Sequence, residues 1–234
     1  MTLNDFYEKD EVIHEVVEAS RSVLSYNLIK KILSKTAAHQ KSKILDVGCG
    51  DGSFIKQFKD KRQIFGLDRS KKAIQKVNKL GLNGIRLNIS NEKFPFENDY
   101  FEIVYMGDVI EHLLNPDFAI MEIQRVLKPE GFLILSTPNL ACWYNRLLLL
   151  FGIQPIFTEV SNIGVFGRSG TVPVGHLRLF TLRALRGFLR FHGFKILREI
   201  GSPFDELPLS MRRLDRVFCK IPSISSIIIV LAQK

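Results

Sequence analysis

The chain has 234 residues, of which 46% are hydrophobic and 24% charged, a composition typical of an ordinary soluble domain. Its three cysteines lie far apart without paired spacing, so neither a disulfide framework nor a zinc cluster is expected, and no metal site is predicted. The net charge of +9 is concentrated in residues 161–234, which hold twelve lysines and arginines against four acidic residues.

Residues 1–8 lack the basic start and apolar core of a signal peptide. The longest apolar stretches, at 147–157 and 221–232, are shorter than the roughly 20 residues that a membrane span requires. Unpaired cysteines suit a reducing compartment. We therefore expect a cytoplasmic protein.

Residues 11–38 carry apolar side chains mostly at steps of three and four, which predicts one or two amphipathic helices. From residue 43 onward, apolar runs of strand length alternate with helical patterns. The runs lie at 43–47, 63–67, 84–89, 101–106 and 132–136. Ser70 and Asn115-Pro116 predict helix starts between them, and residues 128–131 predict a β-turn. This alternation indicates a parallel sheet covered on both faces.

The pattern changes after residue 138. Residues 139–180 combine an apolar helical stretch with a loop rich in glycine, serine and proline, and residues 181–192 predict a helix. Two closing strands are expected at 194–200 and 224–231. Prolines interrupt the connection at 201–222, to which no element is assigned. A hairpin-like return there would make one of the last strands antiparallel.

Residues 44–52 read Ile-Leu-Asp-Val-Gly-Cys-Gly-Asp-Gly, a buried strand followed by a glycine-rich turn and an expected helix start. Glycines at this point let the backbone turn tightly and approach a nucleotide cofactor. A nicotinamide cofactor favours Gly-x-Gly-x-x-Gly, whereas the spacing here is Gly-x-Gly-x-Gly with Asp46 and Asp51 at the turn. Acidic side chains suit a ligand with a cationic amine and a sulfonium better than a pyrophosphate.

Polar residues also end the next strands of the predicted sheet. Asp68 lies where an acid accepts hydrogen bonds from both ribose hydroxyls. The third strand ends in Leu87-Asn88-Ile89-Ser90, which could meet the adenine edge. The fourth ends in Met106-Gly107-Asp108, followed by Val109-Ile110-Glu111-His112.

Five segments, at 44–52, 66–70, 94–104, 109–113 and 125–135, resemble successive motifs of class I S-adenosylmethionine-dependent methyltransferases. They are most similar to the small-molecule branch that includes ubiquinone-biosynthesis O-methyltransferases. The resemblance implies an α/β fold with a Rossmann-like, doubly wound sheet of seven strands, mostly parallel with the last strand antiparallel. It also implies S-adenosyl-L-methionine as the cofactor and S-adenosyl-L-homocysteine as the product.

By this resemblance, the glycine turn holds the methionine part of the cofactor above Asp46, Asp68 binds the ribose, and Met106 lines the methionine end of the pocket. Many family members carry an acid where this chain has Asn88, so Asn88 or nearby backbone would accept from the adenine amino group. Cys49 is expected to fill a tight turn and not to act as a nucleophile. The expected cofactor-binding residues are Asp46, Gly48, Cys49, Gly50, Gly52, Asp68, Arg69, Asn88, Ile89, Ser90, Met106 and Asp108.

His112 and His176 are the candidate catalytic residues, because a neutral imidazole near the acceptor can take a proton from a hydroxyl. The alternative for His112 is that Glu111-His112 caps and orients a short helix before Asn115.

Two further groups have open interpretations. Trp143, Tyr144 and residues 147–151 either line an acceptor pocket or lid, or pack as an inserted helix on the core. Three arginines on one predicted helix face either form a solvated basic face or contact an anionic membrane or phosphate; they are Arg183, Arg186 and Arg190.

The sequence therefore predicts one methyltransferase domain over residues 1–234. Its parts are an N-terminal helical segment (1–38), a cofactor-binding half (40–138), an inserted lid or acceptor segment (139–180), and a closing helix with strands (181–234). The expected reaction is methyl transfer to a small or lipid-like acceptor at oxygen. The alternatives are a nucleic-acid methyltransferase, which lacks support from an Asn/Asp-Pro-Pro-aromatic motif, and a non-catalytic cofactor-binding regulator. Peripheral membrane contact through the basic C-terminal part is a further expectation.

Overall fold

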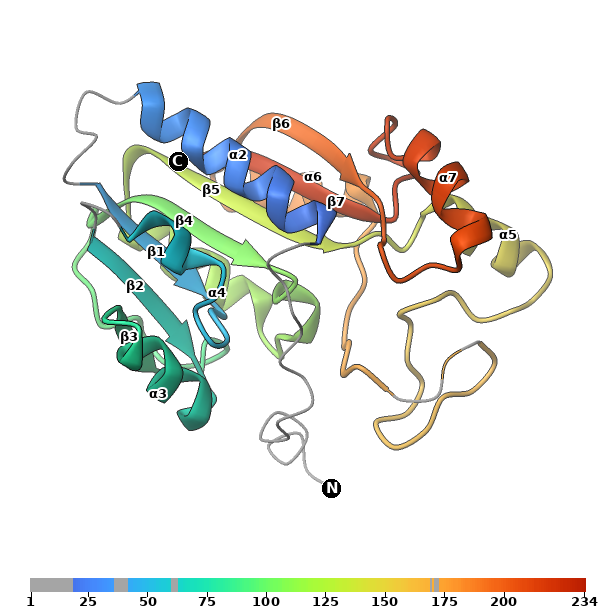
Figure 1. The fold of residues 1–234 in the computed structure, drawn as a ribbon, viewed down its shortest axis with the longest axis horizontal. Helices are drawn as coiled ribbons and strands as arrows, with labels where there is room; N and C mark the ends of the chain where they lie inside the picture. The colour runs from blue at the N-terminus through green and yellow to red at the C-terminus, as the bar shows by residue number, and fades with distance from the viewer. Residues whose placement is uncertain (1–18, 36–41, 60–62, 169, 171–172) are drawn as a thin grey trace.

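A seven-stranded sheet in the order β3-β2-β1-β4-β5-β7-β6 forms the centre of the computed structural model (Figure 1), which describes residues 19–35, 42–59, 63–168, 170 and 173–234. β7 is antiparallel to both neighbours, and the other pairings are parallel. This confirms the predicted α/β sheet. The strands are β1 (Lys43–Val47), β2 (Gln63–Asp68), β3 (Asn83–Arg86), β4 (Phe101–Gly107), β5 (Leu127–Pro138), β6 (Lys195–Ser202) and β7 (Ile227–Gln233).

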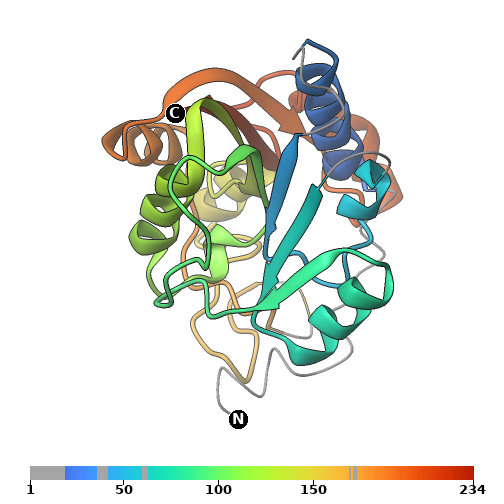
Figure 2. The same cartoon turned by 90° about the vertical axis from the view of Figure 1, so that its left-hand side faces the viewer.

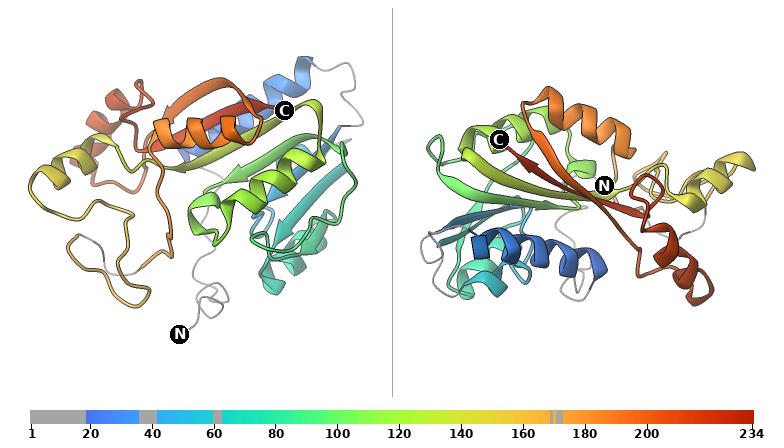
Figure 3. Two further views of the ribbon diagram at one scale, coloured as in Figure 1. Left: turned by 180° about the vertical axis from the view of Figure 1, so that it is seen from behind. Right: turned by 90° about the horizontal axis from the view of Figure 1, so that it is seen from above.

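Helices cover both faces of the sheet, as Figures 2 and 3 show. α2 (Ser20–Lys35) and α3 (Lys71–Lys79) lie on one face, and α4 (Pro116–Val126) and α6 (Leu182–Phe191) lie on the other. α5 (Trp143–Leu150) and α7 (Leu209–Phe218) lie beyond the end of the sheet. Two short 3-10 helices, η3 (Ile55–Phe58) and η4 (Ile110–His112), follow β1 and β4.

The helix starts follow the capping residues of the sequence. The Ser70 hydroxyl, directly before α3, accepts a hydrogen bond from Ala73 N. The Asn115 side chain, directly before α4, accepts one from Phe118 N. Such bonds satisfy backbone donors that the first turn of a helix leaves unpaired. Both predicted starts are confirmed.

Strand side chains alternate between two hydrophobic layers. On β4, Ile103 and Tyr105 are buried on the side of α2, whereas Val104 and Met106 are buried on the side of α4 and α6. This period of two is what a strand with both faces covered requires. None of the helices in the described segments is long and apolar enough to cross a membrane.

Several local predictions were wrong. The glycine turn leads into the 3-10 helix η3 and not into an α-helix. The third strand, predicted over residues 84–89, ends at Arg86. Helix α7 lies in the connection at 201–222, for which neither a helix nor a strand was predicted. Residues 128–131, predicted as a β-turn, lie within β5, at an irregularity in its pairing with β4. Leu127 pairs with Phe101 and Phe132 pairs with Ile103, so the residues between them have no regular partners on β4. Residues 1–18 and 36–38 of the predicted N-terminal segment lie outside the described residues.

Candidate functional site

Three acidic residues lie at or near the edge of the sheet where the parallel strands β1, β2 and β4 end. Asp46 is on β1 in register with Gly66 of β2, and Asp68 ends β2. Asp108 directly follows β4, the strand on the other side of β1. In open α/β sheets, this carboxyl edge is where ligands bind.

The glycine turn after β1 is closed on one side and open on the other. Gly48 N and Cys49 N donate to Leu67 O at 2.7 and 3.0 Å, which fixes the turn against β2. A Cβ on Gly48 (φ +80°) would overlap Val109, so the turn lies directly against the segment that follows β4. A Cβ on Gly50 (φ +52°) would meet no atom of the described residues within 4 Å. Within the described part of the chain, the Gly50 side of the turn therefore has room for a ligand.

Asp46 and Asp68 form a buried acidic pair beneath this turn. Asp46 is only 2% exposed, and its carboxylate accepts no hydrogen bond within the described part of the chain. Burial and the neighbouring Asp68 raise the pKa of Asp46 well above its ordinary value. Asp68 accepts from Gly50 N (3.0 Å) and Ser70 N (2.8 Å), which orient its carboxylate, although burial still raises its pKa. Such a pair fits a cationic ligand, because a positive charge would offset the cost of two buried anions.

We expect Asp46→Asn to stabilise the ligand-free protein by about 1–2 kcal/mol at pH 7. A carboxyl whose pKa is raised on folding binds its proton more tightly in the folded state. Its contribution to stability therefore falls as the pH rises from the ordinary value, about 3.9, through the raised one. The neutral amide of the variant does not titrate and would lack this loss.

Urea unfolding at several pH values measures this effect. The midpoint should be higher for the variant at pH 7, and its decline with rising pH should be shallower. Some decline will remain, because the pKa values of Asp68 and Glu111 are raised as well. A lower midpoint for the variant at pH 7 would contradict the prediction.

Three of the predicted cofactor-binding side chains point into the protein. A Cβ on Gly66 would lie 2.6 Å from the Cys49 sulfur, so this side chain packs against β2. Burial, followed by the charge of Asp46, raises the pKa of the Cys49 thiol well above its ordinary value, in keeping with a packing role. Met106 and Ile89 are buried in the hydrophobic layer under α4. Met106 is fully buried, whereas Cys49 and Ile89 are each 7% exposed, and the contacts of these three residues with a cofactor stay predictions.

The loop after β3 is held by its own polar groups. Asn88 Oδ1 accepts from Ser90 N at 3.2 Å, and Ser90 Oγ accepts from Leu114 N at 3.2 Å. The Arg69 carbonyl accepts from Arg86 Nε at 3.0 Å. Asn88 remains partly exposed at the carboxyl edge, and its contact with an adenine amino group stays a prediction.

Arg21 of α2 reaches the end of β4 and forms an ion pair with Asp108, a contact that no sequence pattern predicts. Asp108 has a positive φ of 54° and accepts from the Ser136 hydroxyl at 2.8 Å. The start of α2 is held in place by Asp205, which accepts from Ser20 N and Ser20 Oγ. Nothing in the sequence distinguishes Arg21 from the other lysines and arginines of the N-terminal segment, so this contact could not be predicted from it.

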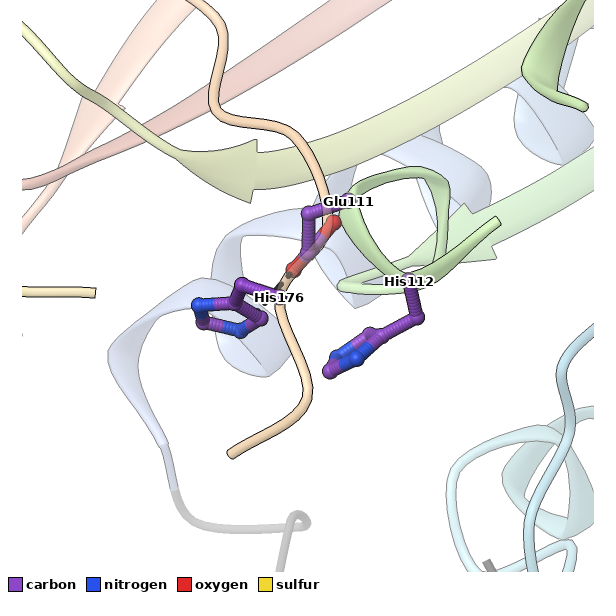
Figure 4. A group of neighbouring side chains, drawn as sticks. All are labelled: Glu111, His112 and His176. Atoms are coloured by element: carbon purple, nitrogen blue, oxygen red, sulfur yellow. Dashed lines mark ion pairs between the residues drawn. The ribbon is translucent and has the colours of Figure 1, made fainter. Parts of the chain in front are cut away.

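A second cluster follows directly after Asp108. Glu111 and His112 lie in η4, and His176 lies in the long loop before α6 (Figure 4). The two imidazole ring centres are 4.7 Å apart, and His176 Nε2 lies 4.0 Å from Glu111 Oε1. The loop is held against η4 because Leu177 N and Arg178 N both donate to Glu111 O, at 2.8 and 3.1 Å. The two candidate histidines, 64 positions apart, are thus neighbours.

Both imidazoles are neutral at pH 7. Burial lowers the pKa of His112, although its bond to the Gly175 carbonyl acts in the opposite direction. Burial, together with the neighbouring His112, lowers the pKa of His176 to about 3. Each ring therefore keeps one nitrogen lone pair.

Glu159 fixes the backbone around His176. Its carboxylate accepts from Val174 N, Gly175 N and His176 N, and it forms an ion pair with Arg168 at 3.1 Å. Because both side chains of this ion pair are less than 10% exposed, the bonds are shielded from water. The loop therefore presents His176 in a defined position.

The remaining candidates divide between packing and solvent. Trp143 Nε1 donates to Asp215 Oδ1 at 2.8 Å, and the indole stacks on Phe218 of α7. Tyr144 is buried in the same small cluster, so both residues join α5 to α7. Arg186 binds Glu199 with two nitrogens. Arg183 and Arg190 are exposed on α6.

Comparison with known proteins agrees with this architecture. A family model described as a methyltransferase domain matches residues 21–199. The ubiquinone biosynthesis O-methyltransferase of Pelagibacter ubique is 29% identical over 122 residues, covering 48% of this chain and 50% of that protein. The demethylmenaquinone methyltransferase of Bacillus pumilus is 31% identical over 169 residues, covering 64% of this chain and 71% of that protein. In most of these sequence matches, the chain spans about half the length of the curated relative.

The fold is also that of a solved structure from Thermotoga maritima, described as an S-adenosylmethionine-dependent methyltransferase and possible histamine N-methyltransferase. The TM-score is 0.63, with 91% of this chain and 89% of that chain covered. At 19% sequence identity, this similarity concerns the fold alone.

Proposed function

The chain belongs to the methyltransferase domain family, whose cofactor is S-adenosylmethionine, and we propose that it methylates a hydroxyl group of a small or lipid-like acceptor. One observation carries the proposal: the open, acidic glycine turn lies against Val109, three residues before His112. A donor site and a proton-accepting site are therefore adjacent at one edge of the sheet. Holding two reactants in this way is a large part of what a group-transfer enzyme contributes.

S-adenosylmethionine, when bound, supplies a methyl group on a positively charged sulfur. On this chain, Asp46 would provide a buried negative charge below the glycine turn, and Asp68 would accept from the ribose hydroxyls. The open side of Gly50 would admit the cofactor close to the backbone. These roles use the two features described above, the buried Asp46 carboxyl and the open side of Gly50.

The acceptor side is formed by η4 and the loop that carries His176. A neutral imidazole can accept the proton of an attacking hydroxyl, and His112 is the better base of the two because the pKa of His176 is lowered to about 3. A hydroxyl needs such help more than an amine does. This favours oxygen as the methylated atom.

Exposed apolar residues support a lipid-like acceptor. The end of α5 and the following turn present large hydrophobic side chains that are at least half exposed: Leu147, Leu149, Leu150 and Phe151. Clustered apolar side chains on a surface mark sites for apolar ligands or membranes. Relatives named for ubiquinone and demethylmenaquinone metabolism support an acceptor of the same kind.

The test is to incubate the protein with S-adenosylmethionine labelled on the methyl group and with metabolite and lipid extracts. We expect label in a small product that partitions into the organic phase, at a level above that of heat-inactivated protein. Label confined to nucleic acid would favour the nucleic-acid alternative. Binding of the cofactor without label in any fraction would favour a non-catalytic regulator.

A further inference from the structure

A single peptide group connects Glu159 to His112. The Gly175 carbonyl lies 3.0 Å from His112 Nδ1, and the N–H of the same peptide group, that of His176, donates to Glu159 Oε2 at 3.1 Å. The Gly175 N–H donates to the same carboxylate oxygen at 2.7 Å. A carboxylate, a peptide group and an imidazole therefore form one hydrogen-bonded chain, although their residues come from three separate parts of the sequence.

This hydrogen-bonded chain fixes which nitrogen of His112 carries the hydrogen. A carbonyl oxygen only accepts hydrogen bonds, so His112 Nδ1 is the donor, and the lone pair of the neutral ring is on Nε2. In proteins, the bond made by one ring nitrogen commonly sets the role of the other in this way. A general base needs this lone pair, because the nitrogen that holds it receives the proton.

The two oxygens of Glu159 have separate partners. Oε1 accepts from Val174 N and pairs with Arg168 at 3.1 Å, which offsets the cost of burying the carboxylate. Oε2 accepts from the N–H groups of Gly175 and His176. The carboxylate is thus anchored at one oxygen and bonded to the peptide group at the other.

The charge of Glu159 acts on this peptide group with little screening by water, because the Glu159 side chain is only 4% exposed. An anion that accepts from a peptide N–H polarises the peptide group, so its carbonyl oxygen becomes a better acceptor. A stronger bond from His112 Nδ1 favours the hydrogen at that nitrogen and makes Nε2 more basic. Burial is the largest effect on the pKa of His112 and lowers it, whereas the Gly175 bond and the charges of Asp108 and Glu159 raise it.

We propose that Glu159 is a positioning residue for His112, holding the hydrogen on Nδ1 and the lone pair on Nε2 through the peptide group between Gly175 and His176. The catalytic part of this role rests on the proposed function. There, the acceptor oxygen bonds to the methyl carbon as the carbon–sulfur bond breaks, the electron pair of that bond stays on sulfur, and the hydroxyl proton passes to His112 Nε2. The hydrogen-bonded chain itself does not depend on methyl transfer.

A simpler interpretation is that Glu159 only holds the loop, and Glu159→Gln separates the two. The glutamine keeps the size of the side chain and one oxygen that can accept from the loop N–H groups, but it removes the charge. Glu122→Gln is the matched control. Glu122 is also a buried carboxylate that pairs with an arginine, Arg125, and accepts from a backbone N–H, that of Phe94, and both partners lie outside the loop of residues 174–176.

Nitrogen-15 NMR of the full chain with labelled histidine reads the tautomer of His112 directly, because a ring nitrogen with a hydrogen and one with a lone pair resonate far apart. His112→Ala assigns the signals. At neutral pH, we expect the wild type to carry the hydrogen on Nδ1. In Glu159→Gln, the two ring signals should move toward one another as the Nε2–H tautomer becomes populated, whereas Glu122→Gln should give the wild-type signals.

The position of the loop is checked in the same samples. The amide signals of Leu177 and Arg178, which donate to Glu111 O, should be those of the wild type in Glu159→Gln. If Glu159 only held the loop, unchanged amide signals would be accompanied by unchanged ring signals of His112. That result in a folded Glu159→Gln variant would overturn the proposal.

Initial rates test the catalytic part, with lipid extract at a fixed amount and saturating S-adenosylmethionine labelled on the methyl group. Glu159→Gln should form labelled product about 10–100-fold more slowly than the wild type, a part of what a general base contributes. Its affinity for S-adenosylmethionine, measured by titration calorimetry, should be unchanged. A wild-type rate in the folded variant would also overturn the proposal.

A second variant covers the case in which Glu159→Gln fails to fold or displaces the loop, since it leaves Arg168 as a buried charge without its carboxylate. Combining Glu159→Gln with Arg168→Met removes both charges, and the same shift of the His112 signals and the same loss of rate are expected.

This proposal and the proposed function can fail separately. A change of the His112 tautomer in Glu159→Gln, without methyl transfer by the wild type to any extract, would leave the hydrogen-bonded chain standing and count against the methyltransferase activity. Methyl transfer by the wild type, with the same tautomer and rate in the variant, would leave the activity standing and remove the role of Glu159.

Discussion

Replacing Asp68 with alanine is expected to weaken S-adenosylmethionine binding by about 100-fold or more. Two hydrogen bonds from ribose hydroxyls to a carboxylate contribute about 1.5–3 kcal/mol each, and 1.4 kcal/mol corresponds to a factor of ten. Asp68 is already oriented for this role by Gly50 N and Ser70 N, so little ordering is needed when the ligand arrives. Isothermal titration of the purified protein with S-adenosylmethionine measures the loss.

Two further variants show whether the carboxylate acts on the ligand. Asp68→Asn keeps the size of the side chain and one acceptor oxygen, so its loss should be smaller, about tenfold. Asp117→Ala removes an exposed carboxylate that pairs with His192 and should leave cofactor affinity unchanged. Equal affinities for wild type and Asp68→Ala, with both proteins folded by circular dichroism, would remove Asp68 from the site.

Gly50→Ala should mainly reduce cofactor affinity, whereas Gly48→Ala should mainly reduce stability. At Gly50, the new Cβ would enter the open space in front of the turn, so cofactor affinity should fall by about 100-fold or more. The cost in stability should be only about 1–2 kcal/mol, from the positive φ. At Gly48, the Cβ would overlap Val109, and a stability loss of about 2–4 kcal/mol is expected from overpacking together with the positive φ.

Gly152→Ala provides the matched control for Gly50→Ala. Gly152 also has a positive φ, +70°, and a Cβ there would meet none of the described atoms within 4 Å, but it lies after α5, away from the turn. Urea unfolding should give similar stability losses for the two variants, whereas titration should show reduced cofactor affinity only for Gly50→Ala. Similar affinities in both would mean that the open side of Gly50 does not face the cofactor.

The cofactor-binding half was largely predictable because its signals are local. The alternation of apolar runs, the capping residues Ser70 and Asn115, and the glycine turn each depend on residues a few positions apart. The helix expected after the glycines was wrong, since the chain forms only η3 there. Helix α7 was missed because prolines flank it and because its buried Asp215 is satisfied by distant partners, Trp143 and Ser226.

The acceptor side depends on contacts that no short stretch of sequence encodes. His112 and His176 were each recognised as candidates, but their proximity, and the burial of Glu111 between β5 and the loop, follow from backbone bonds across more than 60 residues. Arg21 likewise reaches Asp108 only because α2 packs over the end of β4.

The sequence by itself determined the order of the strands and of the α-helices other than α7, the glycine turn, and the acids that we propose for the methyl-donor site. These features follow from hydrophobic periodicity and backbone freedom, which are properties of neighbouring residues. Only the tertiary structure decided which polar groups are buried together, which ones keep a partner, and which are left to a ligand. Burial and charge proximity are set by packing across the whole chain, and they control the pKa values from which the acceptor site is inferred.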